Sequence, residues 1–194
     1  MTEENEAMNQ KKDDVVRDMV RDIENLHEKI HGENGNGVVA PTTPIHGMKS
    51  KRLKVIPDER GRLMEVLRFD DDMFIRFGQA YITTVHHGVT KAWHYHKIQY
   101  DAMCCVKGTL KLVLYDSRED SPTKGAVNEF FIGEHNPMLV QFPPGVYHGF
   151  KGVGKGEAIV LNLPTETYCY DKPDEYRLDA HDNDIPYAWA RKDG

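Results

Sequence analysis

Short runs of apolar residues, separated by glycine, proline and polar turns, follow one another along most of the chain after residue 50. Runs of this length between turn residues are typical of β-strands. The strands that we expect cover residues 51–57, 63–69, 74–86, 91–97, 101–107, 109–116, 127–132, 138–142, 146–150 and 157–163. Many short strands joined by glycine turns favour an all-β jelly-roll barrel. The polar stretch over residues 172–194 should wrap the outside of that barrel.

The first 50 residues have a different pattern. Apolar residues recur at intervals of three and four across residues 13–31, which predicts an amphipathic helix with a narrow apolar face. This face could pair helices in a dimer or dock on the barrel. Residues 33–50 are rich in glycine, asparagine, proline and threonine, which is typical of a linker. We therefore expect a helical N-terminal extension over residues 1–32, a linker over 33–50 and one β-domain over 51–194.

Composition excludes several classes of protein. The net charge is −6 and there is no basic block, which argues against nucleic-acid binding. No apolar run approaches the ~18 residues that a membrane-spanning helix needs, and the polar N-terminus does not resemble a signal peptide. The three cysteines, Cys104, Cys105 and Cys169, lack the spacing of a zinc site. We expect free thiols and a cytoplasmic protein.

Three histidines and one aspartate have a spacing that would bring them into one cavity. His94 and His96 are two residues apart in an expected strand, so their side chains should point to the same side. The aromatic residues on either side of His94 should point to the opposite side. His148, which follows a Pro-Pro-Gly turn, would join them from a distant strand, and Asp101 follows His96. This spacing is close to the cupin pattern of HxH, an acidic residue, a glycine turn and PxGxxH.

Three imidazoles and one carboxylate can either hold a metal or move protons. As ligands, His94, His96, Asp101 and His148 would form a set of three nitrogens and one oxygen, which suits Fe, Mn, Ni or Zn. In the other interpretation, Asp101 orients a catalytic histidine through the second ring nitrogen of that histidine. The residues alone leave both interpretations open.

Further motifs follow one another along the chain: Asp58-Glu59-Arg60-Gly61 with Glu65, Phe77-Gly78-Gln79, Gly88 through Tyr95, Asp116 through Gly125, and Pro143 through Phe150. In this order they resemble the motifs DxRG…E, FxQ, GVLRGLHYQ, D-R-x-x-SPTFG and IPxGFAHGF of the dTDP-4-dehydrorhamnose 3,5-epimerase family of nucleotide-sugar cupins. The resemblance extends from about Ile56 to Trp189, which is nearly the whole expected barrel.

This resemblance implies a homodimeric, cytoplasmic jelly-roll enzyme that acts on a nucleotide-linked 4-keto-6-deoxy sugar and requires no metal. In such a sugar the ketone acidifies the neighbouring C–H groups, so a base can form an enolate that is protonated again on the other face. His94 matches the family's base, and His148 matches its second cavity histidine. Arg60 and Glu65 match residues that hold the nucleotide, and Gln79 lies in a matching substrate strand.

Four positions depart from the family pattern. Lys91 replaces an arginine and keeps the charge without the bidentate geometry, so it could still position the substrate. His96 replaces a glutamine, and Asp101 replaces a cavity lysine. The tyrosine that returns the proton aligns with Leu161, which cannot donate one. No counterpart is recognised for the aspartate that partners the family's base.

The run from His94 to Lys97 also resembles nucleotide-sugar 3,4-ketoisomerases, in which two histidines could move a proton between adjacent carbons. Tyr168 and Tyr170 resemble paired tyrosines of the epimerase family, and they could stack on the substrate or supply the missing acid. We therefore predict an epimerase or ketoisomerase with His94 as base and His96 or Tyr168 as proton partner. The alternatives are a metal-dependent cupin enzyme (a lyase, an isomerase or an oxygenase) and a non-catalytic sugar-binding module.

Overall fold

The computed structural model describes residues 43–191, so the predicted helix and most of the predicted linker lie outside the described residues. Within this range the chain forms strands and turns without any helix, and therefore contains no helix that could cross a membrane. The strands are β1 (Lys49–Arg52), β2 (Val55–Asp58), β3 (Gly61–Met64), β4 (Tyr81–Val85), β5 (Thr90–Tyr95), β6 (Asp101–Lys107), β7 (Thr109–Asp116), β8 (Val127–Gly133), β9 (Met138–Phe142), β10 (Val146–Gly152), β11 (Ala158–Asn162) and β12 (Tyr176–Arg177). The all-β prediction is confirmed for this part of the chain.

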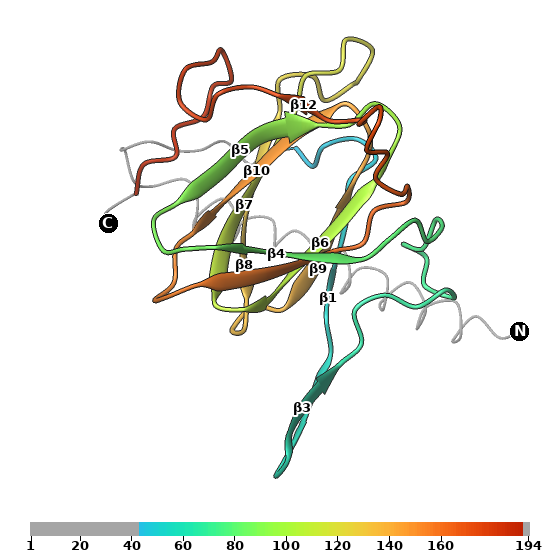
Figure 1. The fold of residues 1–194 in the computed structure, drawn as a ribbon, viewed down its shortest axis with the longest axis vertical. Helices are drawn as coiled ribbons and strands as arrows, with labels where there is room; N and C mark the ends of the chain where they lie inside the picture. Colours follow the sequence, from blue (N-terminus) through green and yellow to red (C-terminus); the bar gives the residue numbers. More distant parts are fainter. Residues whose placement is uncertain (1–42, 192–194) are drawn as a thin grey trace, which may run out of the picture. The chain divides into compact units, whose positions relative to one another are not determined.

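Two antiparallel five-stranded sheets make up the barrel. Their strand orders are β1-β9-β6-β11-β4 and β12-β5-β10-β7-β8, and strands that follow one another along the chain often lie in opposite sheets. This alternation is the topology of a jelly roll. The remaining strands, β2 and β3, pair only with each other and form a hairpin that extends away from the barrel (Figure 1).

The long strand predicted over residues 74–86 is wrong in its first half, because only β4 is extended in a sheet. Gly78 instead crosses the backbone of residues 165 and 166 at close range. A Cβ atom on Gly78 would lie 2.4 Å from backbone atoms of Glu166, so no larger residue fits without displacement. The amide of Gly78 donates to the carbonyl of Pro164 at 3.1 Å. The first half of the run over residues 74–86 therefore packs closely against the backbone of residues 165 and 166, and only its second half forms a strand.

Two other predicted boundaries differ from those in the structure. The predicted linker ended at residue 50, but β1 already begins at Lys49, which pairs with Gln141 of β9. The strand predicted over residues 63–69 ends at Met64. Beyond that point the apolar residues Val66 and Leu67 pack on a cluster of buried side chains instead of pairing with a strand.

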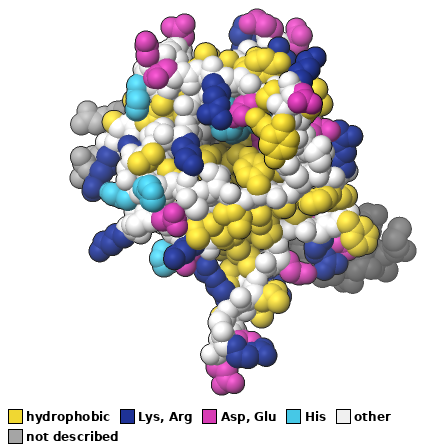
Figure 2. Space-filling model, viewed as in Figure 1, with side chains coloured by type: hydrophobic (Ala, Val, Ile, Leu, Met, Phe, Trp, Pro, Cys, Tyr) yellow, Lys and Arg dark blue, Asp and Glu magenta, His cyan; other side chains and the backbone are white. Residues whose placement is uncertain are grey.

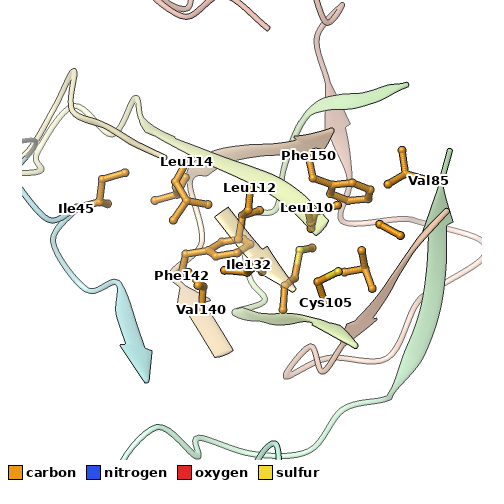
Figure 3. Close-up of a cluster of buried hydrophobic side chains, with 14 residues drawn as sticks. Ile45, Val85, Cys105, Leu110, Leu112, Leu114, Ile132, Val140, Phe142 and Phe150 are labelled. Carbon is orange, nitrogen blue, oxygen red and sulfur yellow. The ribbon is translucent and has the colours of Figure 1, made fainter. Parts of the chain in front are cut away.

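The main hydrophobic core lies between the two sheets (Figure 3). Its buried members come from both sheets and from residue 45: Ile45, Val85, Met103, Cys105, Leu110, Leu112, Leu114, Ile132, Val140, Phe142, Val146, Phe150, Ala158 and Val160. Smaller clusters cover the outer faces. One contains Cys104 and Leu139, and another contains Trp93 and Trp189. Because the central strands β6 and β7 are covered on both faces, they are apolar along most of their length instead of alternating.

The three cysteines have free thiols, as predicted. Cys104 and Cys105 are adjacent on β6 and belong to clusters on opposite faces of the sheet. Both are free and buried, and burial raises the pKa of the Cys104 thiol to about 12. Cys169 is free and exposed.

A buried carboxylate holds the turn that follows β7. Asp116 accepts hydrogen bonds from Arg118 at 2.8 Å, from Ser121 Oγ at 2.6 Å and from Thr123 Oγ1 at 2.7 Å. Burial alone would raise the pKa of Asp116, but these hydrogen bonds hold it well below its usual value. Arg118 in turn packs beneath Gly145, where a Cβ would lie 2.8 Å from its Cγ. The motif from Asp116 to Gly125 therefore supports the turn that leads into β10.

We expect Asp116→Asn to destabilise the barrel by about 3 kcal/mol at pH 7, because Arg118 would lose the partner of a buried ion pair. Urea unfolding would measure this loss. The pKa of Asp116 is lowered in the folded state, so its contribution is complete above the unfolded pKa near ~3.9 and is lost as the pH falls further. The difference in the free energy of unfolding between Asp116→Asn and the wild type should therefore decrease below about pH 4.

The matched control is Asp58→Asn, which breaks the exposed ion pair with Arg60 at the hairpin. This variant should unfold at the same urea concentration as the wild type. An equal loss of stability in the two variants would contradict the structural role of Asp116.

Candidate active site

The three predicted histidines meet inside the barrel. His94 on β5 lies directly opposite His148 on β10 in the strand register, and their ring centroids are 3.9 Å apart. His96 follows the end of β5, with its ring centroid 5.6 Å from that of His94. Trp93 and Tyr95 point to the other side of the sheet, where they pack on Trp189 and Tyr176 respectively. The local strand period therefore brings the histidines together as predicted.

Asp101 lies behind the histidines and is fully buried. Its Oδ2 atom is 3.4 Å from His96 Nε2 and 3.6 Å from His148 Nε2. Its Oδ1 atom accepts hydrogen bonds from Asn162 at 2.7 Å and from Gln99 at 3.0 Å. Burial raises the pKa of Asp101, although His96 and these two amides oppose the rise.

The hydrogen bonds of two rings indicate which nitrogen carries the proton. His148 Nδ1 faces the carbonyl of Val146 at 3.2 Å, and His96 Nδ1 faces the carbonyl of Asp174. A carbonyl can only accept, so each Nδ1 donates, and in the neutral form of such a ring Nε2 carries no proton. Both Nε2 atoms then point at Asp101. A proton shared by Asp101, His96 and His148 would relieve the repulsion between the lone pairs of the carboxylate oxygen and of the two Nε2 atoms. These three side chains could therefore store a proton.

Two cavities of about 500 Å³ each share Tyr81, His94 and Glu175 in their walls. The first also contains His96 and Tyr168. The second also contains Lys91 and Arg177. His94 therefore lies where the two cavities meet, and a substrate with two polar ends could occupy both.

His94 is suited to act as a base. Burial, together with the nearby His96 and Arg177, lowers the pKa of His94 to about 3, so its ring is neutral near pH 7. Burial and the neighbouring His94 likewise lower the pKa of His148. Within residues 43–191 no hydrogen bond engages the His94 ring, which leaves it available to a ligand. Among the described residues, no carboxylate forms an ion pair with His94 in the way that the family pattern would suggest.

The structure places four other predicted residues at these cavities. Lys91 lines the second cavity and donates to Thr83 Oγ1 at 3.1 Å. Gln79 lines the first cavity, and its Oε1 accepts from the amide of Tyr168 at 3.2 Å. Gln79 thereby positions the loop that carries Tyr168 and Tyr170. The rings of these two tyrosines contact each other at 5.0 Å and are exposed at the mouth of the cavity.

Arg60 and Glu65 lie away from the cavities of their own chain. The Arg60 side chain is 85% exposed on the β2–β3 hairpin and pairs with Asp58, while Glu65 pairs with Arg68 at 3.2 Å. The structure of one chain therefore does not bring these two predicted nucleotide-binding residues to the site.

Leu161, which aligns with the proton-donating tyrosine of the family, does not face the cavity. On β11 the inward-facing residues are Ala158, Val160 and Asn162, and Leu161 packs on the outer face. The fully buried Asn162 is the residue of this strand that faces the site. The alternation of side chains along β11 is a signal in the sequence that could have indicated this.

The segment from Asp174 to Arg177 is a second feature that sequence reasoning missed. It was expected on the outside of the barrel, but β12 pairs with β5 so that Arg177 lies opposite His94. Both oxygens of Asp174 accept backbone amides at Lys97 and Ile98, at 2.9 and 2.8 Å. This segment closes one side of the cavities. Its polar composition gave no indication of that position.

The predicted metal ligands also lie together. One nitrogen from each of His94, His96 and His148 lies within 4.8 Å of the others, and Asp101 lies beside two of them. Imidazoles and a carboxylate in this arrangement could hold a divalent transition metal after small movements of the side chains. Geometry alone therefore agrees with both of the interpretations that the sequence left open.

A cluster of three histidines inside a jelly-roll barrel, two of which line a cavity, defines the protein as a cupin-type enzyme. The chain belongs to the dTDP-4-dehydrorhamnose 3,5-epimerase family, whose sequence pattern matches residues 42–194. The predicted family is thus confirmed.

Relatives and solved structures agree with this assignment. The chain is 42% identical to the probable low-salt glycan biosynthesis epimerase Agl13 of Haloferax volcanii, over 69% of this chain and 87% of that protein. It is 40% identical to the spore coat polysaccharide biosynthesis protein SpsL of Bacillus subtilis, over 75% and 96%. The crystal structure of a dTDP sugar isomerase from Desulfovibrio desulfuricans superposes with a TM-score of 0.73 at 32% identity, over 79% and 98%. These matches favour an acid–base epimerase and do not favour the metal-dependent alternative.

His94 and His148, whose pKa values are lowered in the folded protein, should make stability depend on pH. Because the folded pKa of His94 is about 3 and its unfolded pKa is about 6.5, the unfolded state binds more protons between these values. The free energy of unfolding should therefore fall as the pH drops from 7.5 to 5, by about 2 kcal/mol for His94 alone. Urea titrations at several pH values would measure the slope.

The dependence of the free energy of unfolding on pH should be weaker in His94→Asn than in the wild type. It should be unchanged in His135→Asn, which removes an exposed histidine outside the cavities. If His94→Asn showed the same slope as the wild type, His94 would not be held neutral by burial.

Proposed function

We propose that this protein epimerises a nucleotide-linked 4-keto-6-deoxy sugar, with His94 as the base. The observation that supports this most directly is the position of a neutral imidazole where the two cavities meet. The family assignment supplies the reaction class, and the name of the dTDP sugar isomerase supports a thymidine-diphosphate sugar as substrate. The chemistry requires no metal or other cofactor. The buried free thiols support a cytoplasmic location.

Proton removal next to a ketone needs a base and a means of stabilising the enolate. His94 would take the proton and become an imidazolium. The enolate forms at the same time, so the two charges appear as a pair and not as an isolated buried cation. Lys91 and Arg177, in the wall of the second cavity, supply further positive charge near the developing oxyanion or the diphosphate.

The remaining predicted residues take supporting roles in this proposal. His96, His148 and Asp101 form the buried group that stores and shares a proton behind His94. Tyr168 and Tyr170, held by Gln79, provide aromatic faces at the cavity mouth on which the base or sugar could stack. His96 and Tyr168 were also the sequence-based candidates for the acid.

The direct test is deuterium exchange. Incubated in D₂O with a thymidine-diphosphate 4-keto-6-deoxyhexose, the protein should introduce deuterium beside the ketone, as NMR or mass spectrometry can detect. His94→Asn should slow this exchange by about 10²–10⁴-fold, the typical effect of removing a general base. His135→Asn is the matched control and should exchange at the wild-type rate. Absence of exchange by the wild type with every 4-keto sugar tested would argue strongly against this function.

We further propose that the enzyme is a homodimer in which the β2–β3 hairpin packs on a second copy of the chain. A two-stranded hairpin is only marginally stable on its own, and this one exposes Ile56 and Leu63. Figure 2 shows hydrophobic side chains gathered on the barrel face above the hairpin. Ile82, on the edge strand β4, is also 65% exposed. In such a dimer Arg60 and Glu65 could reach the nucleotide bound by the partner, which would account for their distance from their own cavity.

Leu63→Asp should therefore shift the molecular mass measured by light scattering from dimer to monomer, because a carboxylate would be buried in the interface. Arg60→Ala should leave the dimer intact and raise KM about 10-fold or more, with little change in kcat. Glu119→Ala, an exposed charge change on another loop, is the control for both measurements. A monomeric wild type would rule out the proposed role of the hairpin.

A further inference from the structure

Asn162 occupies the inward position on the strand where the family pattern leads one to expect the proton-donating tyrosine. Its amide nitrogen donates to Asp101 Oδ1 at 2.7 Å and to the hydroxyl of Tyr81 at 2.8 Å. An amide cannot supply a proton to carbon at neutral pH. The acid for the second half of the reaction must therefore come from another residue.

Tyr81 lies beside Asn162 in the sheet. β4 and β11 are antiparallel neighbours, and Asn162 pairs directly with Tyr81 in the register. Directly paired residues place their side chains on the same face of a sheet. A phenol on β4 is thus displaced by only one strand spacing, about 4.8 Å, from the position of Asn162.

Tyr81 also shares both cavities with the base. It lies in one sheet of the barrel while His94 lies in the other, and both residues line each of the two cavities. Inversion at carbon requires a base on one side of the sugar ring and an acid on the other. A substrate between the sheets would have His94 on one side and Tyr81 on the other. Tyr168, by contrast, lines only the first cavity.

The hydrogen bonds of Tyr81 leave its proton available. Its oxygen accepts from Asn162, so the hydroxyl hydrogen is not needed for that contact and can point into the cavity. After the proton has left, the same amide would stabilise the phenolate. Burial and the charge of Asp101 raise the pKa of Tyr81 to about 12, so the phenol keeps its proton near pH 7 until a strongly basic carbanion forms next to it.

We propose that Tyr81 is the catalytic acid that protonates the enolate carbon on the face opposite His94, an assignment that rests on the proposed epimerase function. His94 takes a proton from the carbon next to the ketone, and the electrons of that C–H bond enter the enolate. The Tyr81 O–H bond then breaks, its proton forms the new C–H bond on the other face, and the phenolate remains. Proton transfer from the His94 imidazolium to the phenolate through water restores both residues, so no proton is gained or lost overall.

The test separates deprotonation from inversion. With a thymidine-diphosphate 4-keto-6-deoxyhexose in D₂O, Tyr81→Phe should still exchange the substrate proton, because His94 can return deuterium to the face from which it took the proton. Formation of the epimer should fall by about 10²–10⁴-fold. Tyr115→Phe, a tyrosine that packs on the outer face of the barrel, is the matched control and should retain both activities.

Each outcome decides between distinct conclusions. Normal epimer formation by Tyr81→Phe would overturn the assignment, and it would do so most clearly if Tyr168→Phe lost inversion instead. Loss of both exchange and inversion in Tyr81→Phe, with unchanged thermal unfolding and nucleotide binding, would also overturn it, because Tyr81 would then be needed for deprotonation. Failure of the proposed function itself would look different, since the wild type would show no exchange.

Discussion

The pairing of β5 with β10 is the contact on which the site depends. It places His94 opposite His148, and the register shifts between His148 and Phe150. Gly149 allows the two strands to approach closely, because a Cβ there would lie 2.3 Å from the Cβ of Ala92. On the outer face the same region is covered by Trp93 packed on Trp189. Any larger residue at Gly149 would separate the strands and with them the histidine rings.

Burial then gives the paired residues their chemical properties. Removing water from His94 and His148 disfavours their charged forms, and removing water from Asp101 disfavours its anion. Burial thus disfavours isolated charges on His94, His148 and Asp101, so a proton that enters the group can be shared among neighbouring side chains. The two sheets contribute different parts of this group. His94 and His148 come from one sheet, and Asp101 and Asn162 come from the other, so the sandwich itself assembles the site.

Sequence reasoning predicted the histidine cavity because its main signal is local. His94 and His96 are two residues apart, and strand geometry alone places them on one side. The same reasoning did not indicate that Leu161 points outward while its neighbour Asn162 faces the site, because successive residues of a strand lie on opposite faces. Arg60 was predicted at the site from a motif, but the hairpin that carries it extends away from the barrel. The motif alone did not indicate where this hairpin lies relative to the barrel.

The sequence by itself determined the succession of strands and turns, the inward direction of the histidines and the family. These features depend on residues that are close together along the chain, where a period of two or a glycine turn is sufficient. Only the tertiary structure decided that Tyr81 lies beside Asn162, that the segment from Asp174 to Arg177 closes the cavities, and that His94 is neutral. The physical reason is that strand pairing and burial depend on contacts between segments that are distant in the sequence. The free energies of these contacts depend on tertiary packing, which a local sequence pattern does not indicate.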